Sequence, residues 1–197
     1  MKNKTAVLMG MVFMFAGVLV GCGNSGDRVV SEQTTNQEEV TQTVPQEDVK
    51  IGLAQIVDIS QSYDAGEEDG NAQTNVSIAA VTVDGEGKIL SCKIDSVQVD
   101  IGFGKDGKLV TDLATKFQSK QELGDEYGMK KASAIGKEWY EQADAFAEYC
   151  IGKTADEVKG IAVTEEGKAQ EVDLAASCSV NILGFQDIVV KAVENAK

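Results

Sequence analysis

Apolar and polar residues alternate over much of the chain after residue 50, and this period of two predicts β-strands. The pattern predicts strands over residues 51–63, 76–83 and 89–101. The second strand slips in phase after Ala80. The third shifts phase at Asp95 and Ser96, where we expect a bulge or a break.

Glycine-containing turns separate these segments. Residues 84–87 read Asp-Gly-Glu-Gly and residues 105–108 read Lys-Asp-Gly-Lys. Glycine supplies the positive φ that tight turns need. A polar loop is expected over residues 64–73. The first half of this region is therefore predicted to be an antiparallel β-meander.

The apolar spacing then lengthens to that of helices. Residues 113–121 are a short helix candidate. Ser133 is placed to cap a longer helix that ends at Gly152. One apolar stripe at helical spacing defines that helix and comprises Ile135, Trp139, Ala143, Phe146 and Cys150.

The last part of the chain adds smaller elements. Residues 154–157 read Thr-Ala-Asp-Glu, a capping-box pattern, and residues 161–163 and 169–172 are expected to form a small hairpin. An amphipathic helix begins near Gly184 and occupies the C-terminal end. Because strands cluster first and helices later, we expect an α+β fold and not a parallel doubly wound sheet.

The first 22 residues have a different character. Lys2 and Lys4 precede an uncharged run over residues 6–20, and residues 19–22 read Leu-Val-Gly-Cys. The run is shorter than the about 20 residues of a spanning helix, and no Ala-x-Ala-like site of a plain secretory signal follows it. The segment resembles the lipobox of bacterial lipoproteins. The resemblance implies cleavage before Cys22, a diacylglycerol on its sulfur, acyl chains such as palmitate, and a membrane anchor on the extracytoplasmic face.

Residues 23–50 are rich in Gly, Ser, Thr, Gln, Asn and Glu, contain no aromatic residue and hold Pro45, the single proline. This composition is typical of a disordered tether. We therefore divide the chain into a signal peptide over residues 1–21, a lipidated cysteine with an acidic tether over residues 22–50, and one globular α+β domain over residues 51–197.

Charge and composition exclude several functions. The chain carries 18 basic and 32 acidic residues, and loss of Lys2 and Lys4 with the signal peptide leaves a net charge of −16. Such a surface repels phosphate backbones, so nucleic acid is not an expected partner. The chain contains no histidine, which excludes Ser–His–Asp and Cys–His catalysis, and no metal-binding motif. Cys92, Cys150 and Cys178 cannot all pair internally, and we expect the first two to be buried as small apolar residues.

The candidate binding residues lie in the stretch that precedes the last helix. They are Asp173, Ala176, Ser177, Cys178, Ser179 and Asn181. Small residues let a backbone approach a ligand closely, and hydroxyls and free N–H groups at a helix start suit a phosphate. The alternative to a binding site is an ordinary turn into a helix, in which the hydroxyl groups cap the helix.

This stretch resembles the C-terminal signature of the FMN-binding domain family, which reads roughly Asp-x-x-Ser-Gly-Ala-Thr-x-Thr. In that family the last threonine takes FMN through a phosphoester. Residues 81–89, Val-Thr-Val-Asp-Gly-Glu-Gly-Lys-Ile, are similar to the family's strand-turn-strand. Here Ser177 and Cys178 stand at the Gly and Ala positions, and Asn181 stands at the acceptor threonine. An amide offers no hydroxyl, so the resemblance implies FMN held non-covalently, if at all.

Residues 122–129, Glu-Leu-Gly-Asp-Glu-Tyr-Gly-Met, and residues 135–139, Ile-Gly-Lys-Glu-Trp, also resemble clostridial surface lipoproteins of unassigned function. The chain shows no complete catalytic constellation. We therefore expect a non-enzymatic module that binds a small ligand or a surface protein at the cell membrane. The alternatives are a flavin-binding extracytoplasmic electron carrier and the precursor of a signal-peptide-derived pheromone, which residues 14–21 resemble in length and apolarity.

Overall fold

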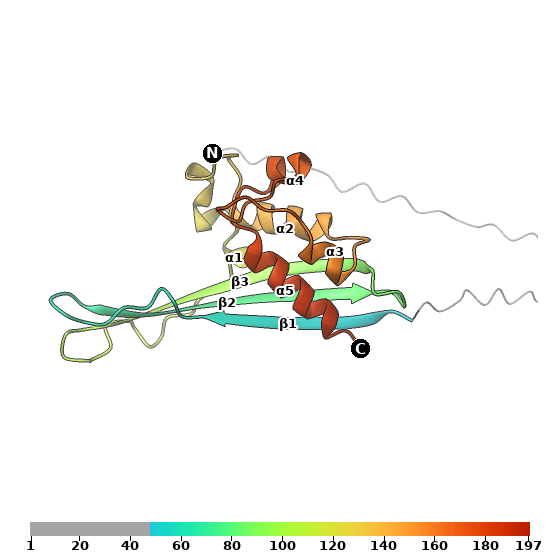
Figure 1. Cartoon of the computed structure of the whole chain (residues 1–197). Coiled ribbons are helices and arrows are strands. Elements are labelled where there is room, and N and C mark those ends of the chain that lie inside the picture. The colour runs from blue at the N-terminus through green and yellow to red at the C-terminus, as the bar shows by residue number, and fades with distance from the viewer. Residues whose placement is uncertain (1–47) are drawn as a thin grey trace, which may run out of the picture. The chain divides into compact units, whose positions relative to one another are not determined.

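Three long strands form an antiparallel sheet in the order β1-β2-β3, as Figure 1 shows. The strands are β1 (Lys50–Asp58), β2 (Gly70–Val83) and β3 (Ile89–Phe103). The computed structural model describes residues 48–197. Helices follow the sheet in the chain, so the predicted α+β meander is confirmed. The first strand ends five residues earlier than expected, and the second begins six residues earlier, within the expected polar loop.

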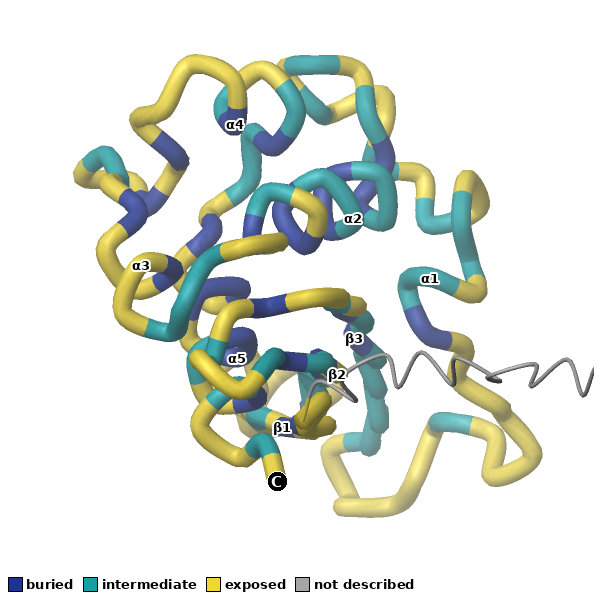
Figure 2. Tube along the Cα trace, turned by 90° about the vertical axis from the view of Figure 1, so that its right-hand side faces the viewer, coloured by how far each residue is buried: buried dark blue, intermediate teal, exposed yellow. Residues whose placement is uncertain are grey.

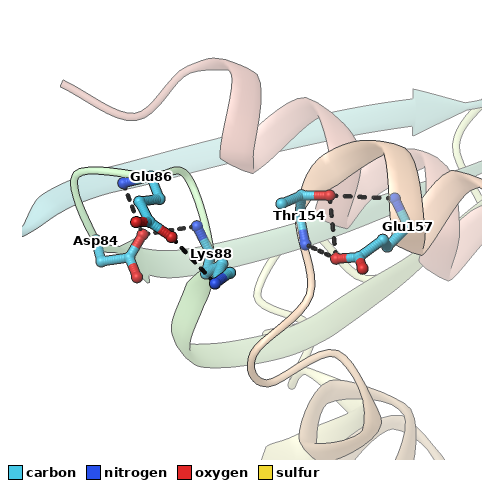
Figure 3. Close-up of polar contacts among 5 residues, drawn as sticks. All are labelled: Asp84, Glu86, Lys88, Thr154 and Glu157. Atoms are coloured by element: carbon cyan, nitrogen blue, oxygen red, sulfur yellow. Dashed lines mark hydrogen bonds and ion pairs between the residues drawn. The ribbon is translucent and has the colours of Figure 1, made fainter.

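The predicted turn between β2 and β3 is confirmed (Figure 3). The Asp84 carboxylate accepts hydrogen bonds from the backbone N–H groups of Glu86 and Lys88, both at 2.9 Å. Gly87 has φ 79°, a conformation that costs glycine little because it has no Cβ. The neighbouring capping box of Thr154 and Glu157 is also present, as expected.

The expected irregularity at Asp95 and Ser96 is wrong. Pairing is continuous there, with Ile78 opposite Asp95 and Ser77 opposite Ser96. The register shifts instead beside the turn, between Thr82 and Val83. The phase change in the sequence has another cause, because the apolar positions move from one face of the sheet to the other along the strands.

The two faces of the sheet differ in cover. The inner face packs under the helices, and its positions near the β2–β3 turn are buried and apolar, such as Ala79, Val81 and Ile94. Gly70 is buried at one end of the outer face, and the other described positions of that face are not buried. Register and the strand period place eighteen residues on this outer face: Ile51, Leu53, Gln55, Val57, Gly70, Ala72, Thr74, Val76, Ile78, Ala80, Thr82, Ser91, Lys93, Asp95, Val97, Val99, Ile101 and Phe103.

The helices lie together on the inner side of the sheet (Figure 1). They are α1 (Lys120–Leu123), α2 (Trp139–Tyr149), α3 (Ala155–Lys159), α4 (Val172–Ser177) and α5 (Leu183–Glu194), with 3₁₀ turns η1 (Gly124–Tyr127) and η2 (Met129–Lys131). Helix α5 crosses β1 and β2, and α2 packs on β3. The core lies between these two helices and the sheet, where Phe146, Ile188 and Ile94 are fully buried (Figure 2).

Helix α5 also protects the free edge of β1. Lys191 Nζ donates a hydrogen bond of 2.8 Å to the backbone carbonyl of Gln55. Asn195 Nδ2 donates one of 3.1 Å to the backbone carbonyl of Leu53. The backbone of Lys197 exchanges two hydrogen bonds with Ile51. An edge strand with filled carbonyls is a poor template for strand addition.

The start of α2 differs from expectation. The helix begins at Trp139, and Glu138, not Ser133, is its N-cap. The buried Glu138 carboxylate also accepts the N–H groups of Met129 and Lys130, at 2.8 and 2.9 Å, and so ties the η2 turn to α2. Ile135 is therefore not part of the helical stripe, whereas Trp139, Ala143, Phe146 and Cys150 are buried as expected.

Two other expectations are wrong in part. The helix expected over residues 113–121 begins only at Lys120, where a Ser119–Glu122 capping box starts it. The small hairpin is reduced to one bridge, between Val163 and Ala169, and α4 follows it. Helix α5 begins at Leu183, beside the predicted start.

The expected signal peptide, Cys22 and residues 23–47 of the expected tether lie outside the described residues. Within residues 48–197, no helix has the length and apolarity that a membrane crossing requires.

Candidate functional site

The inner face of the sheet carries a pocket of about 320 Å³ next to the start of α5. We call it the Trp139 pocket. Its lining residues are Ile56, Asp58, Asn75, Ser77, Ser96, Lys120, Trp139, Val180, Asn181, Gly184, Phe185 and Asp187. The volume lies at the lower end of the range for small-molecule sites.

The floor of the Trp139 pocket is polar. Ser77 and Ser96 face each other across β2 and β3, and Asn75 lies two residues before Ser77 on the same face of β2. Ser96 is only 5% exposed. None of these three side chains makes a hydrogen bond to another residue in the described part of the chain. No buried side-chain nitrogen or oxygen atom in the described part of the chain lacks a hydrogen-bond partner, so the polar atoms of this floor are open to the pocket, where a ligand can pair with them.

Aromatic rings form one wall of the pocket. Trp139 is 7% exposed, and its ring meets Phe185 edge-on, with centroids 5.7 Å apart. Lys120 Nζ lies 5.3 Å from the Trp139 centroid and 4.8 Å from that of Tyr127. Lys120 has no ion-pair partner within residues 48–197, so its charge is held by cation–π attraction beside the pocket.

The start of α5 forms the opposite side. Asn181 Oδ1 accepts the Leu183 N–H at 3.0 Å, and Asn181 Nδ2 donates to the Glu166 carbonyl at 2.9 Å. Gly184 follows in the first turn, where helical N–H groups have no partner inside the helix. The exposed carboxylates of Asp58 and Asp187 also line the pocket. One cation and two anions therefore disfavour a highly charged anion and favour a neutral or weakly charged polar group.

The structure separates the six residues predicted from the sequence. Asp173 and Ala176 lie on α4 at exposed positions, and Ser177 Oγ donates to backbone carbonyls of the same helix. Cys178 is buried in the core. Ser179 donates twice to Gln142 Oε1, through its backbone N–H at 2.8 Å and through Oγ at 3.2 Å. Of the six, Asn181 lines the Trp139 pocket.

Sequence reasoning missed the pocket floor. Asn75, Ser77 and Ser96 are polar, although they lie on the same face of the sheet as the apolar residues Ala79 and Ile94. The signal in the sequence is the phase change in β3, which predicts a bulge or a break but marks the change from apolar to polar inner positions. Trp139 lies in the apolar stripe of α2, as expected, and it also lines the pocket.

The cysteines do not supply reactive chemistry. Cys92, Cys150 and Cys178 are free thiols. Burial raises the pKa of Cys92 and of Cys150 to about 12, and that of Cys178 to about 11. These groups therefore stay protonated near neutral pH, and the thiolate is the reactive form. Cys150 is buried as predicted, whereas Cys92 is only partly buried. No cluster of three potential metal ligands occurs among the described residues.

Comparison with known proteins gives one informative similarity. No family model and no solved structure matches the chain. A chlorophenol reductase from Desulfitobacterium hafniense is 33% identical to the chain over 99 residues, which is 43% of this chain and 29% of the reductase. The chain thus spans less than a third of the length of that relative.

Proposed function

We propose that the chain is a lipid-anchored, extracytoplasmic binding module that takes a small planar heterocycle into the Trp139 pocket. The observation that carries this proposal is the polar pocket floor beside Trp139 and Phe185, where Ser96 is 5% exposed and its hydroxyl makes no hydrogen bond within the described residues. A ring with carbonyl and N–H groups at its edge would pair with Ser96, Ser77 and Asn75. Phe185 and Trp139 would cover its apolar surface.

The anchor is the second part of the proposal. The basic start, the uncharged run and Cys22 support a lipoprotein signal, and two acyl chains give a stable attachment where one is marginal. The acidic composition supports the same view, because charge would not draw this protein to anionic headgroups. The proposed module has no catalytic role, since the pocket contains neither a paired acid and base nor an activated nucleophile.

A flavin electron carrier is the second candidate. The resemblance to FMN-binding domains and the partial similarity to a protein called a reductase favour it. The residues present suit non-covalent flavin better than a phosphoester, because Asn181 lines the pocket but carries no hydroxyl. When bound, a flavin would supply electron transfer. The chain's own part would be to hold the ring edge at Ser96 and to exclude water with Trp139 and Phe185.

The chain contains one tryptophan, Trp139, so its fluorescence reports on the pocket directly. We would titrate the full chain, purified in detergent, with riboflavin and FMN and follow quenching of Trp139. Loss of one hydrogen bond costs about 0.5–1.5 kcal/mol, so Ser96→Ala should weaken binding about three- to tenfold. Ser91→Ala is the matched control, because Ser91 lies on the same strand but on the outer face.

The outcomes separate the candidates. Quenching by either flavin that weakens in Ser96→Ala and not in Ser91→Ala supports the pocket. A natively purified chain with a flavin absorbance spectrum favours the electron carrier, and a colourless chain favours the simple binding module. If riboflavin, FMN, adenosine and nicotinamide all leave Trp139 fluorescence unchanged, the heterocycle proposal is wrong.

A further inference from the structure

Apart from its end at Gly70, the outer face of the sheet has no buried position among the described residues, and it is largely apolar. Ile51, Leu53 and Val57 of β1 are 68%, 64% and 58% exposed. Beside them, Val76 pairs with both Val57 and Val97, so three valines form one row across the sheet. Apolar patches of this kind on soluble domains mark interaction surfaces. We propose that this face docks a second copy of the same chain.

Charge is the first argument for a second copy. The whole chain has a formal net charge of −14, so two copies repel each other over most of their surface. The outer face holds two charged residues, Lys93 and Asp95, which are of opposite sign. Its formal charge is therefore zero. Two copies of this acidic protein meet with least repulsion where both present this face.

Shape is the second argument. A shallow hollow of about 360 Å³ opens on the face beside Ile78 and Ala80, with Lys93, Asp95 and Gln121 around it. Leu53 pairs with Ala80 on the neighbouring strand and projects into solvent. A two-fold interface must be self-complementary. A two-fold axis between Leu53 and the hollow places Leu53 of each copy over the hollow of the other.

Area is the third argument. The strands contain 9, 14 and 15 residues. Each strand residue covers about 3.4 by 4.8 Å of sheet, which gives about 600 Å² per copy and about 1,200 Å² for the pair. That total reaches the lower limit of specific interfaces, so we expect a weak, concentration-dependent dimer.

The phase change in the strands supports the same conclusion. Along β3 away from the β2–β3 turn, inner positions such as Ser96 become polar, while outer positions such as Val97 and Val99 become apolar. An uncovered sheet face that stays in water normally carries polar side chains at its outward positions. In this chain, Val97 and Val99 lie on the outer face, where no helix of the described residues packs over them.

The test measures the molar mass of the full chain in detergent by light scattering over a series of protein concentrations. The mass of the bound detergent is determined separately and subtracted. The wild type should pass from monomer to dimer. Leu53→Glu and Val57→Glu each bury a carboxylate in an apolar contact, and either should weaken dimerisation more than about a hundredfold. Val172→Glu is the matched control, because Val172 is 82% exposed on α4, away from the sheet.

All variants must retain the wild-type urea unfolding midpoint, which Trp139 fluorescence reports. A dimer lost in Leu53→Glu and kept in Val172→Glu supports the proposal. A wild type that stays monomeric at concentrations approaching a millimolar overturns it and assigns the face to lipid or to a different protein. A dimer that survives both strand substitutions also overturns it, because the contact then lies elsewhere.

Discussion

Gly52 lies where α5 crosses closest to the sheet, and Gly52→Ala should destabilise the domain. A Cβ at this position would lie 1.9 Å from the backbone oxygen of Ala192 and 2.9 Å from its carbonyl carbon. It would also lie 3.0 Å from Val81 Cγ2. Ordinary carbon contacts are about 3.5–4.0 Å, so α5 must move by roughly 1.5 Å to admit the methyl group.

The size of the effect follows from what α5 carries. Its residues Ile188, Val189 and Ala192 are fully buried, so displacement of the helix loosens the main core. Overpacking a well-packed core costs typically about 1–3 kcal/mol and sometimes more. The obstacle is helix backbone and cannot rotate aside. Replacing glycine by alanine stabilises by about 0.4–1 kcal/mol through the unfolded chain. With the cost near the top of its range, we expect a net loss of about 2 kcal/mol in the free energy of unfolding.

Urea unfolding followed by Trp139 fluorescence measures this loss. Gly85→Ala is the matched control, because a Cβ at Gly85 meets no atom within 4 Å and its φ is not in the left-handed region. That variant should be neutral or slightly more stable than wild type. A change below about 0.5 kcal/mol in Gly52→Ala, the usual range for unconstrained surface sites, would refute the close approach of α5 to β1.

Three further predictions concern the anchor, the aromatic wall and the flavin. Cys22→Ala should release the protein from membranes and abolish labelling by palmitate; a variant that stays lipidated in fractionation would contradict the lipoprotein proposal. Trp139→Ala should lower stability by about 3–5 kcal/mol, since it leaves a cavity beside Phe185; circular dichroism measures the melt, and a loss below about 1 kcal/mol would mean that the ring contributes little packing. With a flavin transferase, the wild type should give no fluorescent band on a denaturing gel, Asn181→Thr a faint one, and Ser177→Gly/Cys178→Ala/Asn181→Thr a stronger one. A fluorescent wild-type band would refute the non-covalent assignment, and a dark triple variant would leave the family resemblance without chemical support.

Local chemistry of the sequence determined much of the fold. The Asp84 turn, the Thr154 capping box, the buried stripe from Trp139 to Cys150 and the start of α5 were all predictable. Each depends on residues within one turn or one face of a single element. Element order alone then sufficed for the α+β class, because a run of alternating strands followed by amphipathic helices has few other solutions.

Long-range packing decided the rest. Glu138 replaces Ser133 as the cap of α2 because its carboxylate also binds the backbone of Met129 and Lys130, a contact that spacing along the chain does not predict. The same holds for the candidate site. Cys178 is turned into the core and Ser179 toward Gln142, while Asn181 reaches the pocket with Trp139 from α2 and Ser96 from β3.

The phase change at Asp95 and Ser96 shows the limit most clearly. Alternation in a sequence states which residues share a face, but it does not state which face the helices cover. Only the placement of α2 and α5 over the β2–β3 turn end of the sheet makes Ser96 a pocket floor and Val97 part of an open outer face. The sequence determined the two stripes, and the tertiary structure decided what each one meets, because the contacts that distinguish the two faces come from helices more than forty residues away along the chain.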